Sequence, residues 1–296
     1  MRLTMKLLLL ALFAISLSFY DSGCSSAEQT TAMLAFKSGD FEKAEREFLK
    51  ELKTNPSNEE AWYYLAASRI ALNKLQSADS AFKQYRKLGK NTYASEILDA
   101  WVKRYNTGAD NFEKGQKNKD PQEQLKLYKV AKEDFTVCFI ILPDSTMVQQ
   151  YIKSLDSKIA LITVTPFIDK GVEFINAEKF EDAVGEFKKA LETGIEKGNA
   201  AYETVVLDLS IAYSKWGAKL QKENPDDADA YKAKYKLALP YLEDVKNTTN
   251  KENKLIIYQL LVAVYGNLGM NDEALEAIKI RDQLQAELEK EKENKK

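Results

Sequence analysis

The sequence contains no histidine, and this absence removes several kinds of catalytic and metal site at once. Histidine is the commonest general base near neutral pH and the commonest protein ligand for transition metals. Nucleophile–histidine–acid triads and histidine-based zinc sites are therefore impossible within this chain. Paired carboxylates or a lysine base could still act, but no spacing singles out such a group. We therefore expect a protein that is not an enzyme and predict no catalytic residue.

Cysteine, glycine-rich loops and calcium loops are also scarce or missing. The two cysteines are Cys24 and Cys138, and Cys138 lies in an apolar run, so we expect a small buried hydrophobe rather than a reactive thiol. No glycine-rich phosphate loop is present. The densest acidic cluster, Asp226, Asp227 and Asp229, lacks the glycine turn and distal glutamate of a calcium loop, and fits the first turn of a helix better. No metal site and no cofactor are predicted.

Charge of one sign is not in excess either. The chain has 43 lysines and arginines against 45 aspartates and glutamates, a net charge of −2. Nucleic-acid binding needs a clustered basic face, so nucleic acid is not an expected partner. Six prolines and twelve glycines in 296 residues are few, which favours a mostly helical chain.

The N-terminal residues are typical of a targeting segment. Arg2 and Lys6 precede an apolar run of 14 residues over 7–20. A membrane-spanning helix needs about 20 residues, so this run is too short to span and predicts a signal peptide over 1–23.

Small residues stand immediately before the first cysteine. Ser22-Gly23-Cys24 resembles a bacterial lipobox, although Asp21 stands where a lipobox usually has leucine. The resemblance implies cleavage before Cys24 and lipidation of its thiol, which leaves Cys138 without a disulfide partner. The alternative is ordinary secretion, with cleavage after Ala27 and loss of Cys24.

An internal repeat organises the rest of the sequence. Ala44 and Phe48 recur 34 residues later as Ala78 and Phe82, and Trp62 and Leu65 stand between them. Similar patterns follow, including Phe167-x3-Gly171-x2-Phe174 with Ala183-x3-Phe187, and Tyr258-x2-Leu261-x3-Tyr265 with Ala274-x3-Ile278. A period of this length predicts stacked helical hairpins.

These residues and spacings resemble the tetratricopeptide repeat. The resemblance implies an all-α, right-handed α-solenoid of about six helix hairpins in which small residues meet where the two helices of a hairpin cross. The expected crossing residues are Ala44, Ala78, Ala131, Ala183, Ala238 and Ala274. Their separations of 34, 53, 52, 55 and 36 predict elongated central hairpins.

The repeat pattern also divides the chain. We expect a lipoprotein signal peptide over 1–23, an N-terminal repeat pair over 24–91, an elongated hairpin plus an extra helix over 92–163, C-terminal repeats over 164–288 and a charged tail over 289–296. The extra helix is expected over 145–162, with Thr165-Pro166 starting the next one. Gly171 is expected to face Ala183, and Pro240 to kink or restart its helix.

In tetratricopeptide proteins the first helix of each repeat lines a concave face that holds partner proteins. Carried onto this sequence, the expected groove residues are Phe36, Tyr63, Ile70, Ile168, Val172, Ile175, Gln259 and Asn267. The set is apolar and amide-rich, and it lacks the lysine and arginine clamp used for acidic C-terminal tails. The alternative is that several of these apolar residues only pack against neighbouring helices.

Together these features predict a scaffold that is lipid-anchored on the periplasmic face of a bacterial outer membrane and binds other envelope proteins. Ser25 after the cysteine is the feature that favours the outer membrane. The sequence leaves its oligomeric state open. A glycan-capture lipoprotein is one alternative, but the three tryptophans, Trp62, Trp101 and Trp216, fall in predicted helices. A carboxylate-dependent hydrolase is the other.

Overall fold

The computed structural model describes residues 26–293. These residues form α-helices joined by short turns, and no strand occurs among them. The predicted all-α fold is therefore confirmed. The predicted signal peptide and Cys24 lie outside the described residues.

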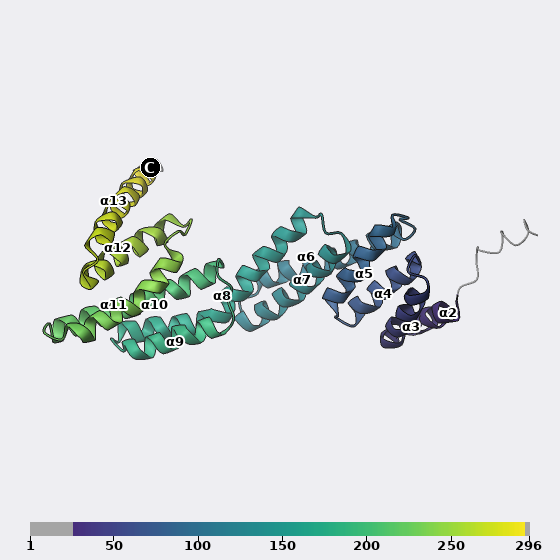
Figure 1. Cartoon of the computed structure of the whole chain (residues 1–296), viewed down its shortest axis with the longest axis horizontal. Helices are drawn as coiled ribbons and strands as arrows, with labels where there is room; N and C mark the ends of the chain where they lie inside the picture. Colours follow the sequence, from purple (N-terminus) through teal and green to yellow (C-terminus); the bar gives the residue numbers. More distant parts are fainter. Residues whose placement is uncertain (1–25, 294–296) are drawn as a thin grey trace, which may run out of the picture. The chain divides into compact units, whose positions relative to one another are not determined.

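Twelve helices in the described part follow one another as six hairpins (Figure 1). The first six are α2 (Ala27–Lys37), α3 (Phe41–Thr54), α4 (Glu59–Ala71), α5 (Leu75–Leu88), α6 (Ala94–Lys117) and α7 (Pro121–Ile141). The others are α8 (Thr146–Asn176), α9 (Phe180–Glu192), α10 (Ala200–Glu223), α11 (Ala228–Val245), α12 (Lys251–Leu268) and α13 (Asn271–Glu293). The central hairpins are longer than the first two, as the alanine spacing predicts, but the last hairpin, α12–α13, is also long, with helices of 18 and 23 residues.

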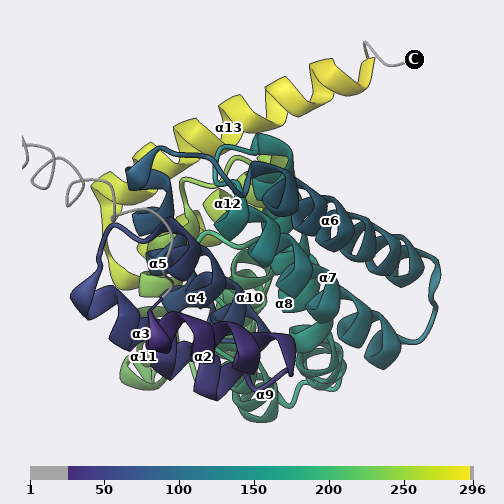
Figure 2. The same ribbon diagram turned by 90° about the vertical axis from the view of Figure 1, so that its right-hand side faces the viewer.

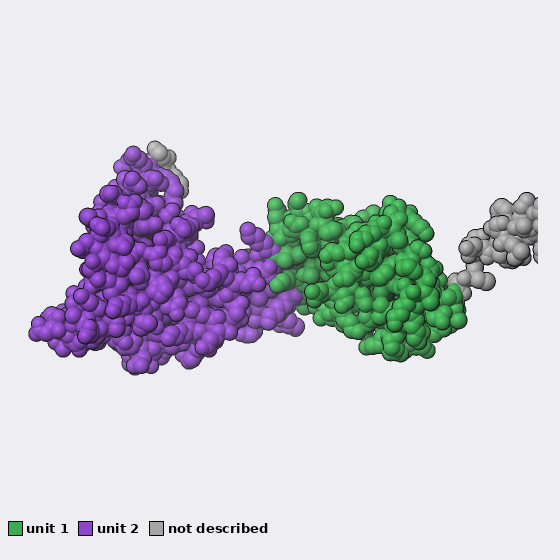
Figure 3. All heavy atoms as spheres, viewed as in Figure 1, with its two compact units in different colours: residues 1–111, 130–152 green, residues 112–129, 153–296 purple. Residues whose placement is uncertain are grey.

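The chain divides into two compact units, coloured separately in Figure 3. Unit 1 comprises the described residues up to Asn111 together with Val130–Ile152, and unit 2 comprises Phe112–Lys129 and the described residues from Lys153 onward. The core of unit 1 is built around Phe48, Leu65 and Phe82. That of unit 2 is built around Phe187, Leu209 and Leu242.

Four hairpins share one turn. A single residue between the two helices has a positive φ: Gly39, Asn73, Glu178 and Gly269, at 81°, 55°, 56° and 77°. The next amide then donates to the carbonyl five residues earlier, over 2.9 Å from Asp40 to Ala35, 2.8 Å from Lys74 to Arg69, 2.8 Å from Lys179 to Phe174 and 2.9 Å from Met270 to Tyr265. This hydrogen bond is that of a Schellman motif, which satisfies carbonyls left open at a helix end.

The expected crossing alanines lie at a fixed distance along the chain from this turn. In each of the four hairpins an alanine stands five residues after the positive-φ residue: Ala44, Ala78, Ala183 and Ala274. Ala44, Ala78 and Ala183 are fully buried. Gly171, which is expected opposite Ala183, lies close to Phe187, one turn further along α9: a Cβ added to Gly171 would lie 2.5 Å from ring atoms of Phe187. The small residue at this crossing accommodates an aromatic ring.

The two stretched hairpins, α6–α7 and α10–α11, have different turns. α7 starts at Pro121 after Asp120, and the side chain of Asp227 caps α11 by accepting from the amide of Ala230 at 3.1 Å. Asp227 therefore acts as a helix cap, as expected. Figures 1 and 2 both show α6 and α7 side by side. Within unit 2 they approach so closely that a Cβ on Gly115 would lie 2.5 Å from the ring of Tyr128.

The expected start of a new helix at Thr165-Pro166 is wrong. α8 runs without a break from Thr146 to Asn176, with Pro166 inside it, so the expected extra helix and the first helix of the next hairpin are one element. A proline inside a helix costs about 3 kcal/mol because it removes one backbone hydrogen bond. Fully buried Leu155 and Val164 anchor this helix in the core before that point. Pro240 likewise lies inside α11.

Candidate functional site

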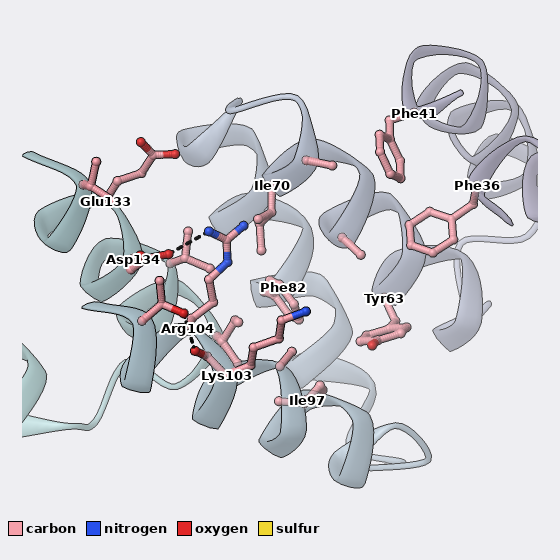
Figure 4. Close-up of a pocket in the computed structure, with 17 residues that line it drawn as sticks. Phe36, Phe41, Tyr63, Ile70, Phe82, Ile97, Lys103, Arg104, Glu133 and Asp134 are labelled. Carbon is pink, nitrogen blue, oxygen red and sulfur yellow. Dashed lines mark hydrogen bonds and ion pairs between the residues drawn. The ribbon is translucent and has the colours of Figure 1, made fainter. Parts of the chain in front are cut away.

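Unit 1 contains a cavity of about 540 Å³ (Figure 4). First helices α2, α4 and α6 supply most of its lining, α7 supplies most of the rest, and α3 and α5 contribute Phe41 and Phe82. The lining residues are Phe36, Phe41, Tyr63, Ala67, Ile70, Ala71, Phe82, Ile97, Ala100, Lys103, Arg104, Thr107, Val130, Glu133, Asp134, Val137 and Ile141. Pockets of this size, mostly apolar with a few polar groups, are the usual form of a binding site.

Aromatic side chains form one wall of this cavity. The ring of Phe36 packs edge-on against Phe41, with centroids 5.5 Å apart, and Tyr63 stacks on Tyr93 at 4.6 Å. Phe82 meets Tyr63 edge-to-face at 6.4 Å. Burial raises the pKa of Tyr63 to about 12, so its hydroxyl stays neutral at physiological pH.

Charged side chains form the opposite wall. Arg104 on α6 donates to the carboxylate of Asp134 on α7 over 2.7 Å. The Asp134 side chain is only 4% exposed, whereas that of Arg104 is 39% exposed. Lys103 and Glu133 are exposed beside this pair, and Figure 4 shows the Lys103 amine directed toward Phe82 and Tyr63. A buried carboxylate needs such a cation to remain charged.

A buried carboxylate also fixes the aromatic wall against α6. Glu59 opens α4 and is 7% exposed. It accepts from the amide of Thr92 at 3.1 Å and from its hydroxyl at 2.6 Å. The amide of Tyr93 donates to the Tyr85 hydroxyl at 3.3 Å. These contacts hold the segment before α6 on α4 and α5, so the cavity is preformed.

The structure brings three of the eight predicted groove residues together. Phe36, Tyr63 and Ile70 line the unit 1 cavity. The other five do not. Ile168, Val172 and Ile175 lie on α8, where Val172 is 38% exposed and Ile175 is buried, and Gln259 and Asn267 lie on α12. Ile175 borders a second cavity in unit 2.

The sequence prediction missed the cavity residues on α6 and α7. Ile97, Ala100 and Arg104 stand at positions i, i+3 and i+7 of α6, a spacing that puts them on one helix face. They could not be predicted because this hairpin matches the repeat pattern only loosely.

Two of the tryptophans contact other residues of unit 1. Trp101, on α6, stacks on Tyr105 at 5.0 Å, and Trp62 donates its indole N–H to the carbonyl of Pro56.

Cys138 is fully buried in unit 1, as expected, and its Sγ lies 3.5 Å from the carbonyl oxygen of Trp101. Burial raises the pKa of this thiol to about 12, which leaves it protonated and unreactive.

Over residues 26–293, no group of three or more acidic, cysteine or histidine side chains is placed to hold a metal ion. No helix in that range is both long and apolar enough to cross a membrane.

No family model matches the chain, and no curated protein matches it. Among solved structures, the chain is similar to BtubC (BKLC) from P. vanneervenii. The two share 15% sequence identity, the match covers 90% of this chain and 93% of that chain, and the TM-score is 0.26. A likeness of that extent assigns neither a fold nor a function.

Proposed function

We propose that the chain is a tetratricopeptide-type scaffold of the bacterial envelope that binds an apolar segment of another protein in the unit 1 cavity. One observation carries this proposal. Groove positions expected from two successive repeats, Phe36, Tyr63 and Ile70, line one cavity of about 540 Å³. A helix or extended segment laid across first helices would place an apolar anchor against these side chains.

The composition of the cavity supports protein binding over catalysis. Its aromatic residues resemble the side chains that supply most of the energy at protein interfaces. Its one tight charge pair, Arg104 with Asp134, is already neutralised internally. The remaining exposed charges, Lys103 and Glu133, stand at the edge of the cavity, where they select among partners more than they add affinity.

Photo-crosslinking tests this proposal. A benzophenone amino acid at position 63 should form an adduct with one envelope protein, while the same group at Leu49 should not. Leu49 is 37% exposed on α3 and does not line the cavity. The captured protein is then purified and titrated against Ala100→Trp and Leu49→Trp.

Ala100 is exposed and lines the cavity, so a tryptophan there fills the space without removing a core contact. We expect Ala100→Trp to weaken binding at least tenfold and Leu49→Trp to leave it unchanged, with equal melting temperatures. Equal binding by both variants would show that the cavity is not the partner site.

We also propose, from the sequence, that Cys24 carries a lipid that anchors the chain to the outer membrane. Replacing Cys24 with alanine removes the acylated atom and should move the protein from the membrane fraction to the soluble periplasmic fraction. Ser26→Ala serves as a control that keeps the cysteine. Membrane retention of the Cys24→Ala protein would contradict a lipid anchor.

A further inference from the structure

Unit 2 contains a second cavity, larger than that of unit 1. Its volume is about 680 Å³, and it lies between the end of α8, the start of α9 and the second half of α10. The lining residues are Ile175, Asn176, Glu178, Phe180, Lys215, Ala218, Lys219, Lys222 and Glu223.

This cavity borders the added length of the stretched α10–α11 hairpin. On one face of α10, Trp216 lies under the amine of Lys234 of α11, 3.4 Å from the ring centroid. A Cβ added to Gly217 would lie 3.1 Å from the ring of Tyr235, so the two helices are tightly packed here. The other face carries the cavity residues. The tight packing of α10 on α11 therefore holds the cavity-lining face of α10 in a fixed position.

Three lysines form a row on this wall. Lys215, Lys219 and Lys222 stand at positions i, i+4 and i+7, which places them on one side of the helix. The acids of the lining are both near Lys219, with Glu178 at 2.8 Å and Glu223 at 3.9 Å. Lys215 and Lys222 are exposed, and neither makes an ion pair in the described part of the chain. The hydrogen bond from Lys219 lowers the pKa of Glu178, and the nearby charge of Lys222 adds to this effect.

The floor between the lysines is apolar. Ile175 and Phe180 are buried, at 8% and 7% exposure. The amine of Lys219 lies 5.9 Å from the centroid of the Phe180 ring and is held there by Glu178. Lys219 therefore spans the floor, and Lys215 and Lys222 stand on either side of it along α10. The lining carries three lysines and two glutamates, so it keeps a net positive charge. Cations that flank an apolar floor are complementary to carboxylates that flank an apolar side chain.

We propose that this cavity binds an acidic segment of a partner protein, in which carboxylates on both sides of an apolar residue pair with Lys215 and Lys222. The apolar residue lies against Ile175 and Phe180. The site is separate from the unit 1 cavity, and it needs no free C-terminal carboxylate.

A fluorescein-labelled peptide, Glu-Leu-Glu-Glu-Phe-Glu with both ends blocked, is the probe for this site. Fluorescence anisotropy with the full chain should show binding that weakens as salt rises, because exposed ion pairs are screened over about 8 Å at 0.15 M salt. The double variant Lys215→Gln/Lys222→Gln should bind about tenfold more weakly, since each exposed pair supplies up to about a factor of five. Ala218→Trp, which fills the floor from an exposed position, should also weaken binding.

The matched control is Lys232→Gln/Lys236→Gln. It removes the same charge from α11, and neither lysine lines the cavity. We expect this control to bind the peptide within twofold of the wild type, and a peptide with glutamine in place of glutamate not to bind. Four results would overturn the proposal: no binding of the acidic peptide by the wild type, equal losses in the two double variants, unchanged binding by Ala218→Trp, or displacement by an equal concentration of inorganic phosphate. The last result would indicate a site for small anions.

Discussion

The cavities of unit 1 and unit 2 both lie beside the first helices of successive hairpins, but they place charge differently. In unit 1 one wall of the cavity is aromatic, and the most buried charge of its lining, on Asp134, is matched by Arg104 at 2.7 Å. In unit 2 the floor is small, and the lining carries three lysines against two glutamates. Burial and aromatic contact thus suit the first cavity to apolar anchors, and the net positive charge suits the second to acidic ones.

The largest expected difference between the two units is the cost in stability of adding a methyl group at a glycine where two helices cross. A Cβ on Gly171 in unit 2 would lie 2.5 Å from the ring of fully buried Phe187, whereas one on Gly108 in unit 1 would lie 3.3 Å from Phe135. We expect Gly171→Ala to lower the free energy of unfolding by about 2–3 kcal/mol through overpacking. Gly108→Ala should stay within about 1 kcal/mol of the wild type, because the gain in helix propensity offsets a small shift.

Urea denaturation measures both changes. Gly171→Ala combined with Phe187→Leu should recover part of the loss, because the smaller side chain makes room for the added methyl group. Equal costs at the two glycines would show that the crossings of the two units are packed alike.

The charge pairs provide a second contrast of intermediate size. Arg104→Met leaves the Asp134 carboxylate buried without its cation, so we expect a loss of about 1–2 kcal/mol in the free energy of unfolding. Lys219→Met removes the exposed pair with Glu178 and should not shift the urea midpoint measurably.

A rescue variant separates charge from packing in unit 1. Arg104→Met/Asp134→Leu replaces both partners by apolar side chains, and we expect it to be more stable than Arg104→Met alone. If the double variant is less stable than the single one, the contribution of Arg104 comes from its aliphatic packing instead.

Local rules explain what could be predicted from the sequence. The turn at Gly39 and the crossing at Ala44 lie within one short segment, so their spacing repeats visibly at Gly269 and Ala274. The continuity of α8 could not be predicted, because helix packing on both sides outweighs the local effect of Pro166.

The candidate sites were predictable only in part, for the same reason. Phe36 and Tyr63 occupy regular repeat positions, whereas Arg104 and Lys215 lie in stretched helices where the repeat gives no register. The row of lysines on α10 depends on how that helix passes the α8–α9 turn, which is a tertiary relation.

Two aspartates, half-buried Asp208 in unit 2 and buried Asp134 in unit 1, give the smallest expected difference and the one that depends on pH. Asp208 on α10 has no ion-pair partner in the described part of the chain, and burial raises its pKa to about 6. Its unfolded value is near 3.8, so the folded state binds the proton more tightly and stability rises as pH falls from above 6 to below 4. The charge on Asp208 therefore destabilises the fold at pH 7.

Asp208→Asn should raise the free energy of unfolding at pH 7 by about 1 kcal/mol, because part of the side chain remains solvated. The difference from the wild type should shrink as pH falls through 6 and be mostly lost by pH 4, because Asp208 is then protonated in the folded state and partly protonated in the unfolded state. Urea denaturation at pH 4, 5, 6 and 7 measures this dependence.

Asp134→Asn in unit 1 is the matched comparison and should lower the free energy of unfolding at pH 7, since it weakens the hydrogen bond from Arg104. A loss of stability at pH 7 in Asp208→Asn would mean that its carboxylate has a cationic or hydrogen-bonding partner, as Asp134 does.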